Sequence, residues 1–145
     1  MKNLVSSLAF AICVVATGAP AFAQQSGGLK VEFQGPGGHS SGAYGRVSAL
    51  HAAARAVILI QKALPAGSYQ ITNLTGGNSV NSIASDGLIE MKVTAANAAA
   101  YQALVAAVTK AAAEGAAAEN AFRGVKPGDL TSGAPATVRS IVSPF

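Results

Sequence analysis

Hydrophobic and polar residues alternate along three short stretches, and this period of two predicts three strands with one buried face each. In residues 29–34, Leu29, Val31 and Phe33 alternate with polar neighbours. Residues 69–75 and 87–94 show the same alternation, and Asp86-Gly87 supplies a turn before the last of them. The chain is therefore expected to contain a sheet.

Two longer segments are predicted to be helices. Residues 47–64 end at Pro65-Ala66-Gly67 and carry apolar residues at helical spacing, namely Val47, Leu50, Ala54, Val57 and Ile58. Residues 95–122 are mostly alanine, with a narrow apolar stripe of Tyr101, Leu104, Val105 and Val108. Gly115 is expected to fray or end this helix. The alanines suit close contact with another helix, or reflect helix propensity alone.

The rest of the chain completes a pattern of six elements. Residues 124–135 are rich in Gly, Pro and Ser, and residues 136–143 form a possible last strand. The order strand, helix, strand, strand, helix, strand is the split βαβ arrangement. We therefore expect an α+β, ferredoxin-like fold, a four-stranded antiparallel sheet with both helices on one face. Its other face and two edges would remain open.

The first 23 residues have the features of a secretory signal peptide. A basic start is followed by an apolar run, Leu4 to Thr17, and by Ala21-Phe22-Ala23, the small-x-small pattern of a cleavage site. The run is shorter than the roughly 20 residues of a membrane span, although a retained anchor is the alternative. The expected mature protein is one secreted or periplasmic domain, residues 24–145, without a membrane segment.

Composition excludes several kinds of site. The only cysteine, Cys13, lies in the signal segment, so a disulfide or thiolate site is not expected in the mature chain. Ten basic and six acidic residues give a net charge of +4. Because the basic residues are scattered and are not interleaved with aromatic residues, we expect no nucleic-acid partner.

Two glycine turns each present one polar side chain. Residues 35–46 read GPGGHSSGAYGR, in which Gly37 and Gly38 precede His39, and residues 76–83 read GGNSVNSI, in which Gly76 and Gly77 precede Asn81. The glycines are expected to shape the loops. Few bulky residues surround His39 and Asn81, so both side chains are candidates for contact with a ligand.

The first loop also fits two other patterns. Gly38-His39-Ser40-Ser41-Gly42 fits the nucleophile-elbow pattern, but the only later histidine, His51, precedes every acid that a triad would need. The loop precedes a helix and could instead cradle an anion through backbone N–H groups. We expect that arrangement to form only half a site, and a tight turn is the simpler explanation.

The segments VEFQGPGGHSSGAYGRVSALHAAARAVILIQKA and NLTGGNSVNSIASDGLIEMKV resemble the lid, or dimerisation, domain of the M-twenty metallopeptidases. This family includes glutamate carboxypeptidase, aminoacylase and succinyl-diaminopimelate desuccinylase. The resemblance covers residues 29–94 and extends more loosely through the second helix. It implies an inserted, ferredoxin-like domain that forms a homodimer through an edge strand and a helix.

The resemblance also implies roles for the two loop residues. A histidine at the position of His39 reaches into the partner subunit's active site and helps hold the substrate carbonyl, and an asparagine at the position of Asn81 lines the same site. The family's two zinc ions belong to a separate catalytic domain. Here two histidines and six non-adjacent acids cannot supply such a site, so neither metal nor catalysis is expected from this chain alone. His51 is expected to be structural.

The chain departs from the family pattern at four positions. Ser48 stands where asparagine is common, Ala84 where proline is common, and Lys92 and Thr94 where an Asp-x-Arg pair is usual. Two functions therefore remain open: an exported, self-associating lid-type module, or an accessory part that lends His39 and Asn81 in trans to a separate metallopeptidase catalytic domain. A fragment that has no function of its own is a third interpretation.

Overall fold

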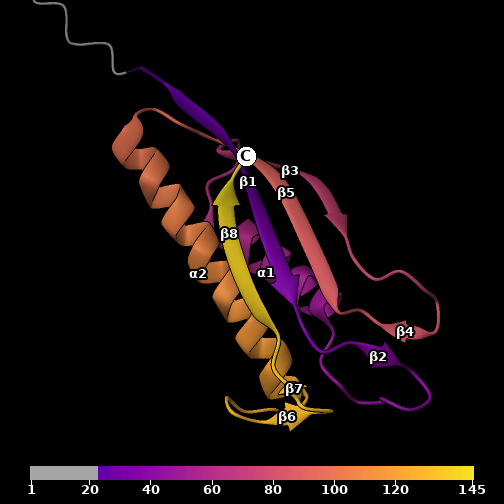
Figure 1. The fold of residues 1–145 in the computed structure, drawn as a ribbon. Helices are drawn as coiled ribbons and strands as arrows, with labels where there is room; N and C mark the ends of the chain where they lie inside the picture. The colour runs from indigo at the N-terminus through magenta and orange to yellow at the C-terminus, as the bar shows by residue number, and fades with distance from the viewer. Residues whose placement is uncertain (1–22) are drawn as a thin grey trace, which may run out of the picture.

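The computed structural model describes residues 23–145, and the predicted signal peptide falls almost wholly outside them. Four strands form an antiparallel sheet in the order β3-β5-β1-β8 (Figure 1). They span Tyr69–Thr75 (β3), Asp86–Ala95 (β5), Gln25–Gln34 (β1) and Arg139–Pro144 (β8). Helices α1 (Ala49–Ala63) and α2 (Ala98–Phe122) complete the predicted split βαβ order. The α+β, ferredoxin-like fold is therefore confirmed.

The sheet buries the residues that the alternating pattern selects. Leu29, Val31 and Phe33 of β1 face the helices, as do Ile89, Met91 and Val93 of β5, and each is at most 1% exposed. On β3 the alternation is interrupted by a bulge between Ile71 and Asn73, which places Leu74 opposite Ile89. Leu74 thereby changes face, and the sequence pattern did not predict this shift.

The two helices contact each other through small side chains. The buried face of α1 consists of Ala49, Ala52, Ala53, Ala56 and Ile60. It meets Ala111, Ala112, Gly115 and Ala116 of α2. A Cβ atom on Gly115 would lie 2.8 Å from the Ala52 carbonyl oxygen and 2.8 Å from the Ala56 nitrogen. Close approach of the two backbones therefore requires glycine at this position.

Two expectations about the helices were wrong. Gly115 does not end α2, which continues to Phe122. The stripe predicted for the first helix is not its buried face either, because Ala54 is exposed and Ile58 is 52% exposed. The helices pack through alanine and glycine, so the small residues mark the contact and some large ones face water.

The last strand begins three residues later than expected and is fastened to α2 by one side chain. The Asn120 amide donates to the Val138 carbonyl oxygen at 2.9 Å and accepts from the Val138 N–H at 2.8 Å. Val138 is 3% exposed. One side chain therefore satisfies both backbone groups of a buried residue just before β8.

Two small ribbons that the sequence did not predict lie at one end of the sheet (Figure 1). One pairs β2 (Gly38–His39) with β4 (Ser82–Ile83), and the other pairs β6 (Leu130–Thr131) with β7 (Ala134–Pro135) inside the Gly/Pro-rich segment. The start of β1 and the end of β8 lie together at the opposite end, where the Phe145 N–H donates to the Gly28 carbonyl oxygen at 3.2 Å.

Substitution of Gly115 by alanine should destabilise the fold although alanine favours helices. The new methyl group would meet two backbone atoms, so the helices must separate, at a cost of about 1–3 kcal/mol in the free energy of unfolding. Urea denaturation measures this free energy. Ala118→Gly, an exposed change on the same helix, is the control and should cost about 1 kcal/mol. A more stable G115A variant would contradict the close contact.

Candidate functional site

The β2–β4 ribbon brings the two predicted ligand-contacting residues together. Gly38 pairs with Ile83 and His39 pairs with Ser82, and the Ser40 N–H donates to the Asn81 carbonyl oxygen at 2.9 Å. As a result, the His39 Nε2 and Asn81 Nδ2 atoms are 3.1 Å apart, although the residues are separated by 42 positions. Both side chains are exposed. The loops thus present one polar pair to the solvent.

Four glycines of these loops, Gly37, Gly38, Gly76 and Gly77, occupy positions where a side chain would be strained or would clash. Gly37, Gly38 and Gly77 have φ angles of +60°, +144° and +72°, which non-glycine residues rarely adopt. A Cβ atom on Gly37 would lie 2.7 Å from the Ser85 Cβ atom, and one on Gly76 would lie 2.5 Å from the Asp86 carbonyl oxygen. The glycines let the loops turn tightly against β5.

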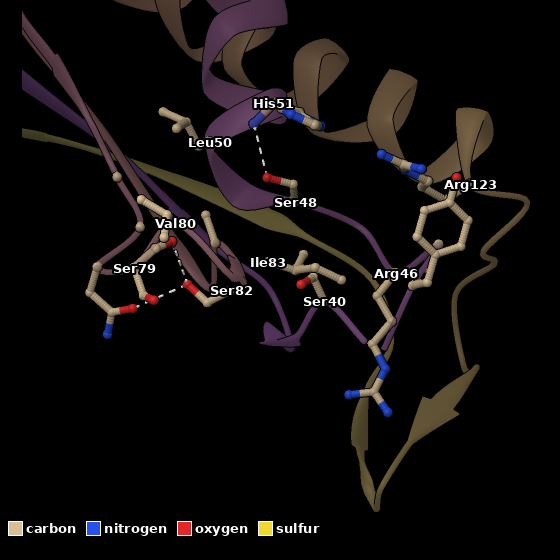
Figure 2. A pocket seen from close by; sticks show the side chains of 16 residues that line it. Ser40, Arg46, Ser48, Leu50, His51, Ser79, Val80, Ser82, Ile83 and Arg123 are labelled. Carbon is tan, nitrogen blue, oxygen red and sulfur yellow. Dashed lines mark hydrogen bonds between the residues drawn. The ribbon is translucent and has the colours of Figure 1, made fainter. Parts of the chain in front are cut away.

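A groove of about 520 Å³ lies between the loops and the start of α1 (Figure 2). The first loop contributes Ser40, Tyr44 and Arg46, and the second contributes Ser79, Val80, Ser82 and Ile83. Ser48, Leu50 and His51 of the α1 region and Arg123 after α2 form the far wall. Tyr44 is 93% exposed, and Val80 is likewise fully exposed.

A buried carboxylate lies behind this wall. Glu119 of α2 is 0% exposed. Its oxygens accept from the Ser48 N–H at 3.2 Å, from Arg55 Nε at 3.1 Å and from Arg123 Nε at 3.2 Å. Burial alone would raise the pKa of Glu119, but the hydrogen bonds from Ser48, Arg55 and Arg123 outweigh it and hold this pKa below its usual value. Glu119 is therefore an internal anion.

Glu119 occupies the position that the sequence suggested for a bound anion, at the backbone N–H groups that begin α1. The Ser48 N–H binds Glu119, the Ala49 N–H donates to the Ala84 carbonyl oxygen at 3.0 Å, and the His51 N–H donates to the Ser48 hydroxyl at 3.4 Å. Three of the backbone donors that an external anion would need at the start of α1, those of Ser48, Ala49 and His51, are thus already used within the chain. The carboxylate at this helix end belongs to the chain itself.

His51 lies apart from the His39–Asn81 pair. Its side chain is 58% exposed, and Nδ1 lies 3.7 Å from Glu119 Oε1. Ser40, the serine of the elbow-like motif, follows the short strand β2 and not a core strand of the sheet. Neither position forms a nucleophile with a neighbouring base in the way that a hydrolase triad requires.

Two further findings concern metal ligands and membrane helices in residues 23–145. In this range no three His, Cys, Asp or Glu side chains come close enough together to hold a metal ion. Nor does this part of the chain contain a helix with the length and apolarity that crossing a bilayer requires.

Comparison with protein families decides the family. The model of the peptidase dimerisation domain matches residues 24–120. The chain belongs to this family. The match includes both glycine loops, both helices and three strands of the sheet. A comparison with curated proteins gives no match.

Solved structures share the fold at low sequence identity. An aminobenzoyl-glutamate utilization protein from Klebsiella pneumoniae is 18% identical with a TM-score of 0.60, and the match covers 88% of this chain and 32% of that chain. A Staphylococcus aureus tripeptidase is 16% identical with a TM-score of 0.60, and the match covers 83% of this chain and 29% of that chain. A hydantoinase/carbamoylase family amidase from Burkholderia ambifaria is 20% identical with a TM-score of 0.60, and the match covers 86% of this chain and 28% of that chain. This chain thus spans about 30% of each of these longer chains.

Replacement of Glu119 by glutamine should destabilise the domain in a pH-dependent way. At neutral pH the variant loses charge-assisted bonds to Arg55 and Arg123, at a cost of about 2 kcal/mol. The pKa of Glu119 is lowered by folding, so its contribution is complete above the ordinary carboxyl pKa and is lost as pH falls through the folded-state pKa. Urea denaturation of both proteins at neutral and acidic pH measures the difference.

Glu114→Gln is the matched control, because Glu114 is exposed on the same helix and its Lys110 pair is 3.9 Å long. It should change stability by less than about 1 kcal/mol at either pH. A difference between wild type and E119Q that stayed constant on acidification would contradict the ionised state of Glu119.

Proposed function

We propose that this peptidase dimerisation domain is an exported module that self-associates and has no catalytic activity of its own. The observation that supports self-association most directly is that the two edge strands of the sheet are each open on one side. β3 and β8 end the sheet, and each has one side that pairs with no strand of the described chain. An open edge is a template for a strand of a second molecule.

Of the two edges, β3 is better suited to pairing. Its sequence, YQITNLT, contains no charge and no proline, whereas β8 begins with Arg139 and ends with Pro144, two residue types that protect edges. β3 also carries Leu74, which is 43% exposed, and the neighbouring helix α1 carries Ile58, which is 52% exposed. A two-fold pair of β3 strands would extend the sheet across both copies.

A lysine on β3 should weaken this dimer. Two copies of Leu74→Lys would place like charges near one another in a two-fold interface and remove exposed apolar surface, so the chain from Gln24 to Phe145 should become monomeric at concentrations where wild type is dimeric. Light scattering at several concentrations measures the mass. Ile141→Lys on β8 is the control, because Ile141 is 50% exposed on the other edge.

In this test the I141K variant should remain dimeric. A wild-type chain that stayed monomeric up to about 1 mM would contradict the proposal, because a dimer with so high a dissociation constant would not form in use. Loss of the dimer in I141K but not in L74K would assign the interface to β8.

Export is part of the proposal and rests on the amino-terminal sequence. The basic start, the apolar run and Ala21-Phe22-Ala23 have the order of a cleaved signal, and β1 begins at Gln25, the second residue of the predicted mature chain. The expected product is a secreted or periplasmic chain that begins at Gln24. Mass spectrometry of the exported protein would show whether residues 1–23 have been removed.

A second function is favoured by the His39–Asn81 pair. The structure places these side chains 3.1 Å apart on an exposed ribbon. The ten-residue strand β1 separates this ribbon from the end where β1 starts and β8 ends, a span of about 30 Å. A domain continuing from either strand end would begin far from His39. This separation supports a role for the pair at an active site in another molecule, such as a zinc-dependent peptidase or amidohydrolase domain.

If the pair acts in trans, loss of His39 should slow hydrolysis by that partner. His39→Ala should reduce kcat by about two to three orders of magnitude, as for loss of one oxyanion donor. The assay compares hydrolysis by a separately encoded catalytic domain with wild-type or variant chain added. Gln61→Ala, an exposed change on α1, is the control. Equal rates with wild type and H39A would contradict this function.

A further inference from the structure

Two arginines and a phenylalanine form an exposed patch where α1 lies against the end of α2. Arg55 belongs to α1, Phe122 is the last residue of α2, and Arg123 follows it. The Phe122 ring is 66% exposed, and its centroid lies 5.0 Å from the guanidinium carbon of each arginine. Cation–π contacts thus hold both arginines beside the ring. Arg55, Phe122 and Arg123 are called the arginine–phenylalanine patch below.

A buried carboxylate fixes the two arginines from within the domain. The Nε atom of Arg55 donates to one oxygen of Glu119 at 3.1 Å, and the Nε atom of Arg123 donates to the other at 3.2 Å. The Glu119 side chain is 0% exposed, whereas those of Arg55 and Arg123 are 37% and 24% exposed. Because these bonds use Nε, the terminal amino groups of both guanidiniums remain as donors for an acceptor outside the described chain.

The patch presents positive charge to the solvent. Its two guanidinium groups are partly exposed, whereas the carboxylate between them is hidden from water. His51 lies 3.7 Å from Glu119, and its side chain, 58% exposed, adds a further cation when it is protonated. His51 and Arg123 also lie on the helix side of the groove (Figure 2). This surface is therefore complementary to an anionic partner.

The fixed arginines and the exposed ring together favour a protein partner over a free ion. Arginine and aromatic side chains are enriched among the residues that dominate the binding energy of protein interfaces. An unrestrained arginine loses side-chain freedom on binding, but Arg55 and Arg123 are already restrained by Glu119. The Phe122 ring adds apolar surface that a small anion would not cover. A segment that combines carboxylates with an apolar side chain would contact the whole patch.

We propose that the arginine–phenylalanine patch is a docking site for an acidic segment of a partner protein, and that Glu119 is the positioning residue that orients its arginines. Carboxylates of the segment accept from the terminal amino groups, and an apolar side chain between them covers Phe122. The patch belongs to α1 and to the end of α2, not to the β2–β4 ribbon. It therefore does not depend on the roles of His39 and Asn81.

Nuclear magnetic resonance of the ¹⁵N-labelled chain from Gln24 to Phe145 tests the docking. The Nε–H signals of Arg55 and Arg123 should be observable, because Glu119 holds these protons. The probe acetyl-Glu-Leu-Glu-amide should shift both signals with one saturation curve. Acetyl-Gln-Leu-Gln-amide should shift neither. Acetyl-Glu-Ser-Glu-amide should bind about 3- to 10-fold more weakly than the leucine peptide, because serine leaves the ring uncovered.

Variants of the patch assign the two kinds of contact. Phe122→Ala should remove the preference for the leucine peptide over the serine peptide. Arg55→Gln and Arg123→Gln should each weaken binding of the leucine peptide about 10-fold, the effect of one lost hydrogen bond between charged groups. Lys110→Gln is the matched control, because it removes one positive charge from an exposed position on α2 outside the patch. It should leave binding unchanged.

Glu119→Gln separates orientation from simple attraction between charges. The change removes a negative charge beside the two arginines, so electrostatic attraction alone would make the acidic peptide bind more tightly. If Glu119 orients the arginines, the variant should instead bind about 3- to 10-fold more weakly. Backbone amide spectra show whether the variant is folded. If it fails to fold, the arginine and phenylalanine variants still test the docking site.

Several results would overturn the proposal. Equal shifts with the glutamate and glutamine peptides would remove the role of carboxylates, and inorganic phosphate that bound as tightly as the leucine peptide would indicate a general anion site. Arginine signals that moved with chain concentration alone would assign the patch to a second copy. Vesicles of phosphatidylglycerol that bound wild type but not R55Q, without any peptide binding, would assign it to a lipid surface. Tighter binding by E119Q would remove the positioning role.

Discussion

The contact between α1 and α2 determines where the loops of this domain can lie. Gly115 and Glu119 are one helical turn apart on the buried face of α2. Gly115 lets the two backbones meet, and Glu119 accepts the Ser48 N–H at the first turn of α1. The first contact sets the distance between the helices, and the second holds the start of α1. The His39 loop leads directly into that start, so its position depends on both.

The same contact explains why the domain can keep a buried charge. An unpaired buried carboxylate would be costly, but Glu119 has an amide donor and two arginines around it. The arginines are partly exposed, and the Phe122 ring lies 5.0 Å from each guanidinium group. The carboxylate thus occupies the place at a helix start where many proteins bind an external anion.

Local pattern predicted the sheet well because burial on one face leaves a period of two in the sequence. Leu29, Val31 and Phe33 carry that signal, as do Ile89, Met91 and Val93. The helices were harder, because alanine contributes little to an apolar stripe whether or not it is buried. Gly115 was assigned to the end of a helix by propensity, whereas tertiary contact with Ala52 and Ala56 determines its role.

The sequence singles out His39 and Asn81 as candidate residues but does not predict how they lie together. Glycine turns and the family resemblance pointed to His39 and Asn81, yet nothing local to either loop indicates that β2 pairs with β4. Glu119 was missed because a single acid in an alanine-rich helix resembles a solvated one. Its spacing of four from Arg123 was the available signal.

We propose that this dimerisation domain pairs with itself through β3. Hydrogen exchange of the β3 and β8 backbone amides, measured at low and high protein concentration, tests this pairing most directly. If β3 forms the interface, amides on its open side should become more protected as concentration rises, while those on the open side of β8 should not. Exchange rates on β3 that are independent of concentration would contradict it.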